Sequence, residues 1–313
     1  MIRFGILGCG KITERFLKGC RLCDEVVVNA AASRDLHKAQ DYCASHQIPH
    51  AYGSYEALCA DNTVDAVYIA TPPFAHYELV KMALNHDKHV LCEKPFVASE
   101  QEVEELFESA RRKGLMLMEA MKAVFTPTTR QVKSWLAEEK IGKLRYAEAS
   151  YCYLSPFGHD HWVFDAKRMG GGILDVGVYA IAYLNELISK DIQESVAMST
   201  IGETGADEFM QILIKYDKGV QASVRGALNV KTKNIAYFYG SEGYIEVEDF
   251  WKTTKAKLVL YDGEVVNYDG EFESEFYFQI DHFVRCIKKG TVQSPVMGES
   301  ASKAIIRLIN RHL

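Results

Sequence analysis

Three polar side chains stand where an enzyme could use them to move a proton. Lys94 follows the apolar run His89–Cys92, and ligands of parallel sheets bind at the carboxyl ends of the strands. Asp175 and Tyr179 are four residues apart, so a helix would place both on one face. A tyrosine with a pKa of ~10 becomes a useful acid or base when a nearby cation lowers that pKa. Lys94, Asp175 and Tyr179 are therefore a candidate catalytic set.

Each of these residues also has a structural interpretation. Lys94 could be a surface lysine after a strand, Asp175 a polar helix cap and Tyr179 an ordinary core aromatic. The segment around the last two carries glycines at positions 170, 171, 172 and 177. A helix with so many glycines is poor by propensity, which indicates that another part of the protein packs closely against it.

A glycine-rich turn follows the apolar run Ile2–Leu7 and opens a helix-like stretch. Its glycines let the backbone approach a pyrophosphate, and the helix N-terminus supplies N–H donors and a positive dipole. Thr13 replaces the third glycine of the usual pattern, which loosens the packing of helix on strand. The alternative is a purely structural turn. We interpret the motif as a dinucleotide-binding loop formed by Gly8, Gly10, Lys11 and Ile12.

The end of the next apolar run, Val26–Ala32, indicates which dinucleotide is preferred. An NAD site usually places Asp or Glu here, where the carboxylate accepts from the ribose 2′-hydroxyl. This chain instead has Ser33 and Arg34, with Lys38 one turn further on, a set that could surround a 2′-phosphate. Asp35 is better explained as a negative charge in the first turn of the helix. We expect NADP as the cofactor, with NAD possible, unless Arg34 is only a surface arginine.

The first third of the chain alternates between strand-like and helix-like segments joined by short loops, which predicts a parallel sheet covered on both faces. The helix over 99–113 begins with a capping box at Ser99. From about Thr126 the pattern changes to a helix over 128–139 and then to strand-like segments, most of them separated by turn residues, which predicts an antiparallel sheet. These segments cover 144–153, 194–199, 210–216, 220–227 and 235–239. Two helices, over 276–289 and 299–313, end the chain. We expect two domains, residues 1–121 and 122–313, and allow the last helices to pack back on the first.

Composition excludes several classes of function. Hydrophobic residues make up 48% and charged residues 25%, and the net charge is −6, so there is no broad basic field for nucleic acid or membrane. No apolar run approaches the ~18 residues of a spanning helix, so we expect a soluble, cytoplasmic protein. The eight cysteines form no disulfide framework, and the Cys20–Cys23 pair lacks the partners of a zinc site. His159 and His161 also lack a third ligand, so no metal is expected.

Taken in order, these motifs resemble the glucose–fructose oxidoreductase / inositol dehydrogenase / MocA (Gfo/Idh/MocA) family over nearly the whole chain. The most specific match is the Glu93-Lys94-Pro95 motif. Asp175 followed by Tyr179, rather than by histidine, is similar to the dihydrodiol dehydrogenase-like, NADP-linked branch. The matching segments are Gly8–Gly10, Ser33–Asp35, Thr71–His76, Lys88–Pro95, Gly170–Tyr179 and Tyr239–Tyr244.

The resemblance implies an α/β protein: an N-terminal Rossmann domain and a C-terminal α+β domain with a large, open, mainly antiparallel sheet. It implies Lys94 at the nicotinamide, Asp175 and Tyr179 at the substrate, and a homo-oligomer that buries one face of the second sheet. It also implies cofactor contacts from Thr71, Pro72, His76 and Glu93.

One departure affects the substrate. After Glu119-Ala-Met121 the nearest branch tends to carry Trp-x-Arg-Phe, whereas this chain has Lys122 and Val124 at the tryptophan and arginine positions. The substrate of that branch therefore cannot be transferred. The polar-aromatic segment 157–162 could also line the pocket.

We conclude from the sequence that the chain is an NADP(H)-dependent oxidoreductase that moves hydride to or from a CH–OH or C=O carbon of a sugar, polyol or cyclic diol. Tyr179 or Lys94 would transfer the proton and Asp175 would orient the substrate. Two alternatives stay open. One is a nucleotide-binding sensor without turnover, and the other is an oxidoreductase that recycles a tightly bound cofactor.

Overall fold

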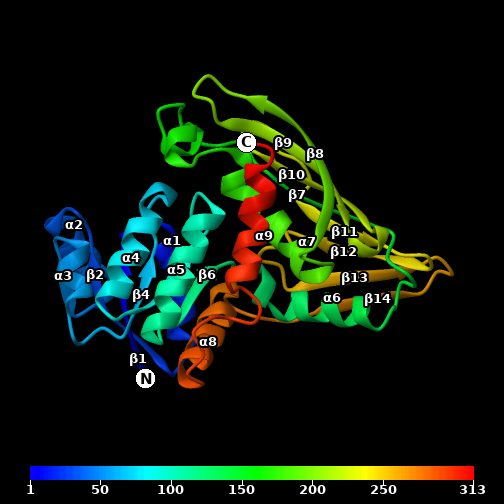
Figure 1. Ribbon diagram of the computed structural model, residues 1–313. Helices are drawn as coiled ribbons and strands as arrows, with labels where there is room; N and C mark the ends of the chain where they lie inside the picture. Colours follow the sequence, from blue (N-terminus) through cyan, green and yellow to red (C-terminus); the bar gives the residue numbers. More distant parts are fainter. The chain divides into compact units, whose positions relative to one another are not determined.

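The computed structural model describes residues 1–313 and divides them into two compact units (Figure 1). The first unit contains Met1–Ala120 and Ser274–Lys303, and the second contains Met121–Glu273 and Ala304–Leu313. The sequence placed a boundary after residue 121 and left the last helices open. In the structure, Ser274–Lys303 groups with the N-terminal residues.

The first unit is built on six parallel strands in the order β3-β2-β1-β4-β5-β6. The strands are β1 (Ile2–Leu7), β2 (Val26–Ala32), β3 (His50–Tyr52), β4 (Ala66–Ile69), β5 (His89–Glu93) and β6 (Leu117–Ala120). The helices are α1 (Ile12–Arg21), α2 (Leu36–His46), α3 (Tyr55–Cys59), α4 (His76–Asn85), α5 (Glu100–Lys113), α8 (Glu275–Lys288) and the start of α9 (Glu299–Asn310), up to Lys303. The winding reverses between β1 and β4, which makes that point the topological switch of the sheet.

Aromatic packing fixes α1 and α8 in this unit. Phe16 of α1 stacks on Tyr68 of β4 with ring centroids 3.8 Å apart, and Phe4 of β1 contacts both Phe16 and Phe283. Gly19 lets the two helices approach, because a Cβ there would lie 2.9 Å from Phe276 and Ile280 atoms. The buried face of α1 therefore packs against both the sheet and α8.

The second unit is built on eight strands in the order β14-β13-β12-β11-β7-β10-β9-β8. They are β7 (Tyr146–Cys152), β8 (Ile192–Ile201), β9 (Asp207–Tyr216), β10 (Gln221–Ala227), β11 (Ile235–Tyr239), β12 (Gly243–Glu248), β13 (Lys255–Leu260) and β14 (Val265–Asp269). All neighbours are antiparallel except β7 and β10, which run parallel. The expected α/β architecture with a large, mainly antiparallel second sheet is confirmed, while β12, β13 and β14 were not foreseen as strands.

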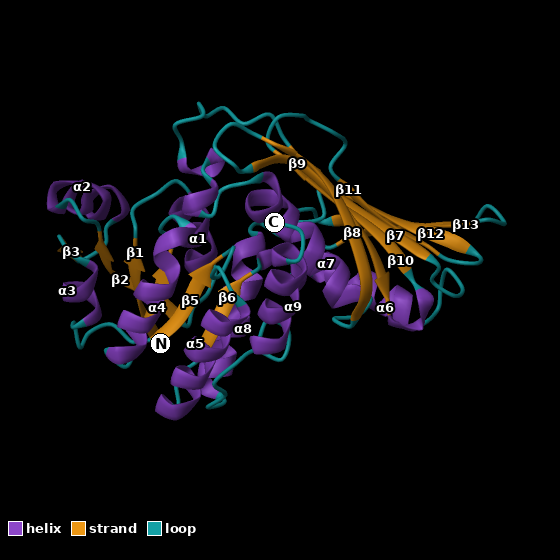
Figure 2. Cartoon of the chain, turned by 45° about the horizontal axis from the view of Figure 1, so that its top comes forward, coloured by secondary structure: helices purple, strands orange, loops and turns teal.

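Two helices, α6 (Pro127–Ala137) and α7 (Val178–Leu187), cover one face of this sheet (Figures 1 and 2). Helix α7 packs on β7 and β10, and α6 packs on β13 and β14. Short 3₁₀ turns at Lys122–Phe125 and Trp162–Phe164 and a π-helical turn at Ile173–Gly177 complete this side. The opposite face of the sheet carries no helix (Figure 2).

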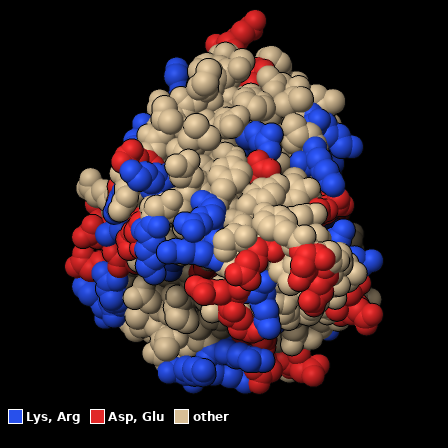
Figure 3. Space-filling view, turned by 90° about the vertical axis from the view of Figure 1, so that its right-hand side faces the viewer, with Lys and Arg blue, Asp and Glu red and all other residues tan.

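Charges of both signs lie side by side on the surface seen from the β13–β14 side, with no broad field of either sign (Figure 3). All eight cysteines are free thiols. None of the helices combines the length and the apolar character that crossing a membrane requires.

Candidate active site

The glycine loop after β1 leaves room for a ligand. Gly8 has φ of +101°, and a Cβ there would lie 3.0 Å from the Ala70 carbonyl oxygen, so this position requires glycine. A Cβ at Gly10 would approach only that same oxygen, at 4.0 Å, which leaves the outer side of the loop open. Lys11 makes no side-chain cap at the start of α1. An open loop before an uncapped helix N-terminus fits a dinucleotide pyrophosphate.

The end of β2 presents one buried hydroxyl and two exposed cations. Ser33 is buried, whereas Arg34 and Lys38 are exposed. The Asp35 carboxylate is occupied, because it caps α2 by accepting from the amides of His37 at 2.9 Å and Lys38 at 3.4 Å. Asp35 is thus the N-cap residue just before the first turn, rather than a member of that turn. This arrangement fits a ribose 2′-phosphate better than a bare 2′-hydroxyl.

His76 joins the loops that follow β4 and β5. Its Nε2 lies 2.9 Å from the Thr71 carbonyl oxygen, and its Nδ1 lies 2.9 Å from the carbonyl oxygen of Pro95. The ring is fully buried, and burial lowers the pKa of His76, so the neutral ring donates from one nitrogen at pH 7. Here His76 positions the Thr71-Pro72 loop beside Lys94.

Two buried carboxyl groups lie next to Lys94. Glu93 accepts a 2.6 Å hydrogen bond from the Tyr68 hydroxyl and a 3.3 Å bond from the Lys94 amide. Glu119 on the neighbouring strand accepts a 2.6 Å bond from the Ser302 hydroxyl. Burial raises the pKa of Glu119 to about 7, and the negative charge of Glu93 adds to this shift. Lys94 therefore directly follows a strand end beside which two carboxyl groups are buried.

The strand register brings these residues to one edge. Leu7 pairs with Ala32 and with Ile69, and Ile69 pairs with Cys92. The residues that follow these four strand ends therefore form a row across the sheet. The row runs from Ser33, Arg34 and Lys38 through Gly8, Gly10, Lys11 and Ile12 to Thr71, Pro72, His76, Glu93 and Lys94.

Asp175 and Tyr179 belong to the second unit and lie on the joined π-helical turn and α7. Two glycines of this segment, Gly172 and Gly177, serve contact with β10. A Cβ at Gly172 would lie 2.9 Å from the Ala227 Cα, and one at Gly226 would lie 2.8 Å from the Gly177 Cα. The close partner indicated by the glycines is thus the backbone of β10. π-Helical turns inside helices are frequent at functional sites.

Asp207 anchors the start of this segment. Its Oδ2 accepts a 2.8 Å hydrogen bond from the Ile173 amide, while its Oδ1 is buried without a hydrogen-bond partner. Burial raises the pKa of Asp207 to about 7. The carboxyl group thus fixes the backbone two residues before Asp175.

Asp175 is held in turn by Tyr153. The Tyr153 hydroxyl donates a 2.8 Å hydrogen bond to Oδ2 of Asp175. Tyr179 lies in the same aromatic group, with its ring centroid 5.9 Å from that of Tyr151, which stacks on Trp251 at 3.7 Å. An oriented carboxylate and a phenol one turn apart can bind a hydroxyl-bearing substrate and exchange its proton.

The polar-aromatic segment before the glycines is held by ring stacking. Phe157 stacks on His161 with centroids 3.9 Å apart, and His159 stacks on Phe164 at 4.9 Å. Nδ1 of His161 accepts from the Val163 amide. No group of three His, Cys, Asp or Glu side chains is arranged to hold a metal ion.

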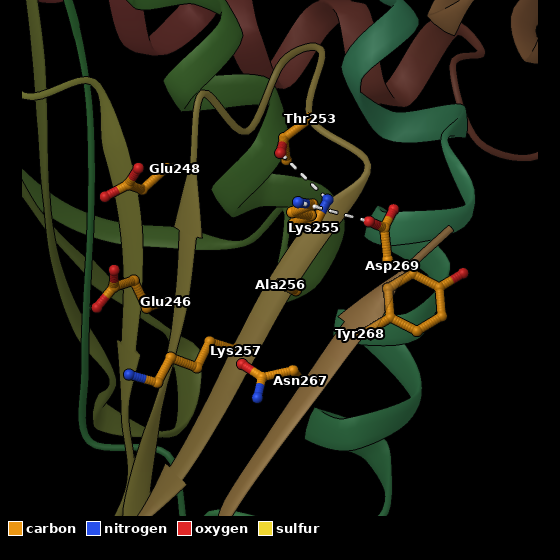
Figure 4. A pocket seen from close by; sticks show the side chains of 9 residues that line it. All are labelled: Glu246, Glu248, Thr253, Lys255, Ala256, Lys257, Asn267, Tyr268 and Asp269. Carbon is orange, nitrogen blue, oxygen red and sulfur yellow. Dashed lines mark hydrogen bonds and ion pairs between the residues drawn. The ribbon is translucent and has the colours of Figure 1, made fainter. Parts of the chain in front are cut away.

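A hollow on the sheet of the second unit lies away from these residues. It measures about 490 Å³ and is lined by β12, β13 and β14, whereas Asp175 and Tyr179 lie on the β7 and β10 side (Figure 4). Acids and lysines alternate around it, and Lys255 pairs with Asp269 at 3.7 Å. This mixed lining offers neither the cofactor loop nor an acid–base pair.

Comparison with known proteins assigns the family. Residues 2–121 match the oxidoreductase family with an NAD-binding Rossmann fold, GFO_IDH_MocA, and residues 129–246 match the GFO/IDH/MocA C-terminal domain. The chain belongs to the Gfo/Idh/MocA oxidoreductase family. This confirms the family that the sequence motifs indicated.

Members similar to this Gfo/Idh/MocA oxidoreductase include two named dehydrogenases. Mouse (Mus musculus) trans-1,2-dihydrobenzene-1,2-diol dehydrogenase is 32% identical over 98% of this chain and 95% of its own. The scyllo-inositol 2-dehydrogenase (NADP(+)) IolU of Bacillus subtilis is 31% identical over 94% and 90%. Among solved structures, KijD10, a 3-ketoreductase from Actinomadura kijaniata in complex with NADP and TDP-benzene, aligns with a TM-score of 0.90. It is 27% identical and covers 99% of this chain and 96% of its own.

Sequence reasoning missed two residues that shape this Gfo/Idh/MocA site. Tyr153 ends a strand-like segment that was foreseen over 144–153, but its hydrogen bond to Asp175 depends on how that strand packs. Asp207 begins β9, where an acid at the head of an apolar strand was the available signal. Lys122 was noticed only as a departure from the related branch.

Proposed function

We propose that this oxidoreductase transfers hydride between NADP(H) and a CH–OH or C=O carbon of a sugar, polyol or cyclic diol. The observation that carries the proposal is the Asp175 carboxylate, oriented by Tyr153 and one turn before Tyr179. The named substrates of the relatives, a cyclic diol and an inositol, are of this class. The NADP of the KijD10 complex and of the IolU name supports the cofactor.

The cofactor would be held along the row of strand ends. Gly8, Gly10, Lys11 and Ile12 would bind the pyrophosphate, and Ser33, Arg34 and Lys38 the 2′-phosphate. Thr71, Pro72 and Glu93 would face the nicotinamide half, with His76 holding their loops. When bound, the nicotinamide accepts or supplies the hydride.

The protein's own groups would handle the substrate oxygen. In the oxidation direction, ionised Tyr179 takes the hydroxyl proton as the C–H hydride leaves, and in reduction it returns that proton to the new alkoxide. Asp175 accepts a hydrogen bond from a substrate hydroxyl and so orients the reacting carbon. Lys94 would bind the nicotinamide ribose and is the alternative proton-transfer group.

The first experiment is a screen of purified protein with NADP⁺ against sugars, polyols and dihydrodiols, following the absorbance of the reduced nicotinamide. Turnover with one of these classes is the expected result. NADP(H) binding without turnover on any of them would favour the sensor. Nicotinamide that stays bound through purification would favour the recycled-cofactor enzyme.

Two variants assign the catalytic roles on the substrate so found. Tyr179→Phe should lower kcat by about 10²–10⁴ while cofactor affinity is nearly kept, because only the proton-transfer group is lost. Lys94→Met should weaken both turnover and cofactor binding, since this lysine would contact both. A Tyr179→Phe protein that keeps more than half of the wild-type kcat contradicts the assignment.

We also propose that two copies associate through the helix-free face of the second sheet. Met198 is 81% exposed there, Val196 60% and Leu213 50%. The strand register places four tyrosines on the same face: Tyr146, Tyr237, Tyr239 and Tyr244. Exposed apolar side chains on a sheet face that no helix covers favour a partner, and a second copy supplies the same chemistry.

A further inference from the structure

Lys122 is buried beside the tyrosine of the candidate site. Lys122 is only 2% exposed, and its Nζ lies 5.2 Å from the centre of the Tyr179 ring. Both residues belong to the second unit, in which the 3₁₀ turn Lys122–Phe125 packs on α7. A lysine ammonium within about 6 Å of an aromatic ring centre is attracted to the ring.

The turn that carries Lys122 is fixed by its neighbours. The Thr126 hydroxyl caps α6 by accepting from the Thr129 amide at 3.1 Å. The Thr129 hydroxyl donates a 2.6 Å hydrogen bond to the Ala123 carbonyl oxygen. Lys122 is therefore held beside Tyr179 by a capped helix rather than by a mobile loop.

Other ionisable groups lie on the elements that pack around Tyr179 in its own unit. Strand β7 presents Tyr151 to α7, and the π-helical turn presents Asp175, which pairs with Tyr153. Strand β10 contributes small residues at this contact, and its Arg225 pairs with Glu148 at 3.6 Å. On α6 and α7, Lys133 pairs with Glu186, while Arg130 is exposed. Lys122 is thus a buried cation next to Tyr179.

We propose that Lys122 is a positioning residue for Tyr179, and that its ammonium group holds the phenol ring and favours the ionised phenol oxygen. This inference rests on the proposed acid–base role of Tyr179. A phenol surrounded by apolar side chains and one carboxylate would resist ionisation, and a fixed positive charge reverses that preference. Lys122 would do this from the tyrosine's own unit, in addition to any contribution of Lys94.

The test is the pH dependence of kcat/KM for substrate oxidation from about pH 6 to about pH 10, where an ionised phenol is needed. Lys122→Met keeps an unbranched side chain that is one atom shorter and removes its charge. It should move the midpoint of the rise in rate upward by about one to two pH units, with a matching 10- to 100-fold loss near pH 7. The rate should recover at high pH. Lys122→Arg keeps the charge and should keep the midpoint within about half a unit.

A uniform loss of rate at every pH, with an unchanged midpoint in Lys122→Met, would show a merely structural role and overturn the inference. Tyr179→Phe separates the two claims. If it keeps most of the wild-type kcat, the acid–base role itself falls. If it is inactive while Lys122→Met keeps the wild-type midpoint, only the role of Lys122 falls.

A second measurement does not depend on the folding of Lys122→Met. The near-ultraviolet absorbance of tyrosinate is followed as pH rises in Lys94→Met and in Lys94→Met/Tyr179→Phe. The difference between the two titration curves reports the ionisation of Tyr179 in a protein that lacks the Lys94 amine and keeps Lys122. A midpoint about one unit or more below ~10 supports the inference, and a midpoint at or above ~10 overturns it.

Discussion

The hydroxyl of Tyr153 donates a 2.8 Å hydrogen bond to Oδ2 of Asp175, and this bond ties the end of β7 to the helical segment of the candidate site. Burial raises the pKa of Tyr153, and the nearby Asp175 charge raises it further. The Tyr153 hydroxyl therefore stays protonated at neutral pH and remains a donor. The orientation of Asp175 toward a substrate is set by this neutral tyrosine.

Tyr153→Phe removes that donor while keeping the ring. A hydrogen bond to a charged group contributes about 1.5–3 kcal/mol, so we expect the KM for the substrate to rise roughly 10- to 150-fold, with a smaller change in kcat. Steady-state kinetics with varied substrate at saturating NADP⁺ measure this. Tyr77→Phe is the matched control, because it removes a hydroxyl that donates a 2.6 Å hydrogen bond to the Glu105 carboxylate, between α4 and α5. Equal KM values for the wild type and Tyr153→Phe would exclude an orienting role.

Asp207→Asn tests the anchor beneath the glycine segment. The pKa of Asp207 is raised to about 7 in the folded protein from 3.8, so folding favours the protonated carboxyl. Its contribution to stability is fully present below pH ~4 and is lost as pH rises toward ~7. Asparagine does not ionise and keeps an oxygen for the Ile173 amide. As pH rises from ~4 to ~7, the wild type should therefore lose up to a few kcal/mol of unfolding free energy that the variant keeps. The Tm of the variant should rise relative to that of the wild type over this range.

Thermal melts of both proteins at matched pH values measure this difference. Thr204→Val is not a suitable control, because its hydroxyl also holds this region by donating to the Phe164 carbonyl oxygen. Asp262→Asn is suitable, since Asp262 is exposed in the β13–β14 turn. A Tm difference that stays constant across the range would show that Asp207 is already ionised at low pH.

The sequence was sufficient for the fold because the signals of the first unit are local. Each apolar run, glycine turn and capping residue lies within one strand–helix unit, and Ser99 caps α5 as expected. The missed strands of the second sheet carry at most part of an alternating signal, such as Ile245 and Val247 of β12, which are buried while Tyr244 and Glu246 are half-buried, and their charged residues resemble loop. The three-residue strand β3 was missed as well, because it is too short to show a pattern. The parallel pairing of β7 and β10 is not encoded locally, because hydrogen-bonding direction depends on where the chain returns.

Only part of the site could be predicted from the sequence, because its contacts join segments that are distant along the chain. Spacing alone placed Asp175 and Tyr179 together on a helix. The partners of that helix come from distant segments, since Tyr153 is 22 residues from Asp175 and Asp207 is 34 residues from Ile173. Lys122 stood out by its type, but its proximity to Tyr179 depends on the packing of one turn on α7.

The oligomer prediction has a direct measurement. Light scattering at micromolar concentration should give at least twice the mass of one chain. Met198→Lys and Leu213→Lys place charges on the helix-free face and should shift the population toward the monomer, because an unpaired buried charge opposes association. Leu22→Lys is the control, since Leu22 is also exposed but lies at the end of α1. A wild-type mass of one chain would refute the dimer.

The cofactor's phosphate gives the last prediction. Arg34 can donate two parallel charge-assisted hydrogen bonds to a 2′-phosphate, and Lys38 adds a second cation. Asp35 does not compete for a ribose hydroxyl without releasing the amides of His37 and Lys38, and losing such a cap costs about 1 kcal/mol. A net gain of about 2–3 kcal/mol corresponds to a roughly 30- to 150-fold preference for NADP over NAD.

The ratio of kcat/KM for the two cofactors measures this preference in the wild type and in Arg34→Ala. We expect the variant to lose about tenfold or more of the ratio, because the guanidinium contacts a group that only NADP carries. Arg21→Ala should leave the ratio unchanged, because it removes an exposed arginine in the last turn of α1, at the end away from the glycine loop. Equal use of both cofactors by the wild type, or an unchanged ratio in Arg34→Ala, would show that Arg34 is a surface charge and that the end of β2 does not select the phosphate.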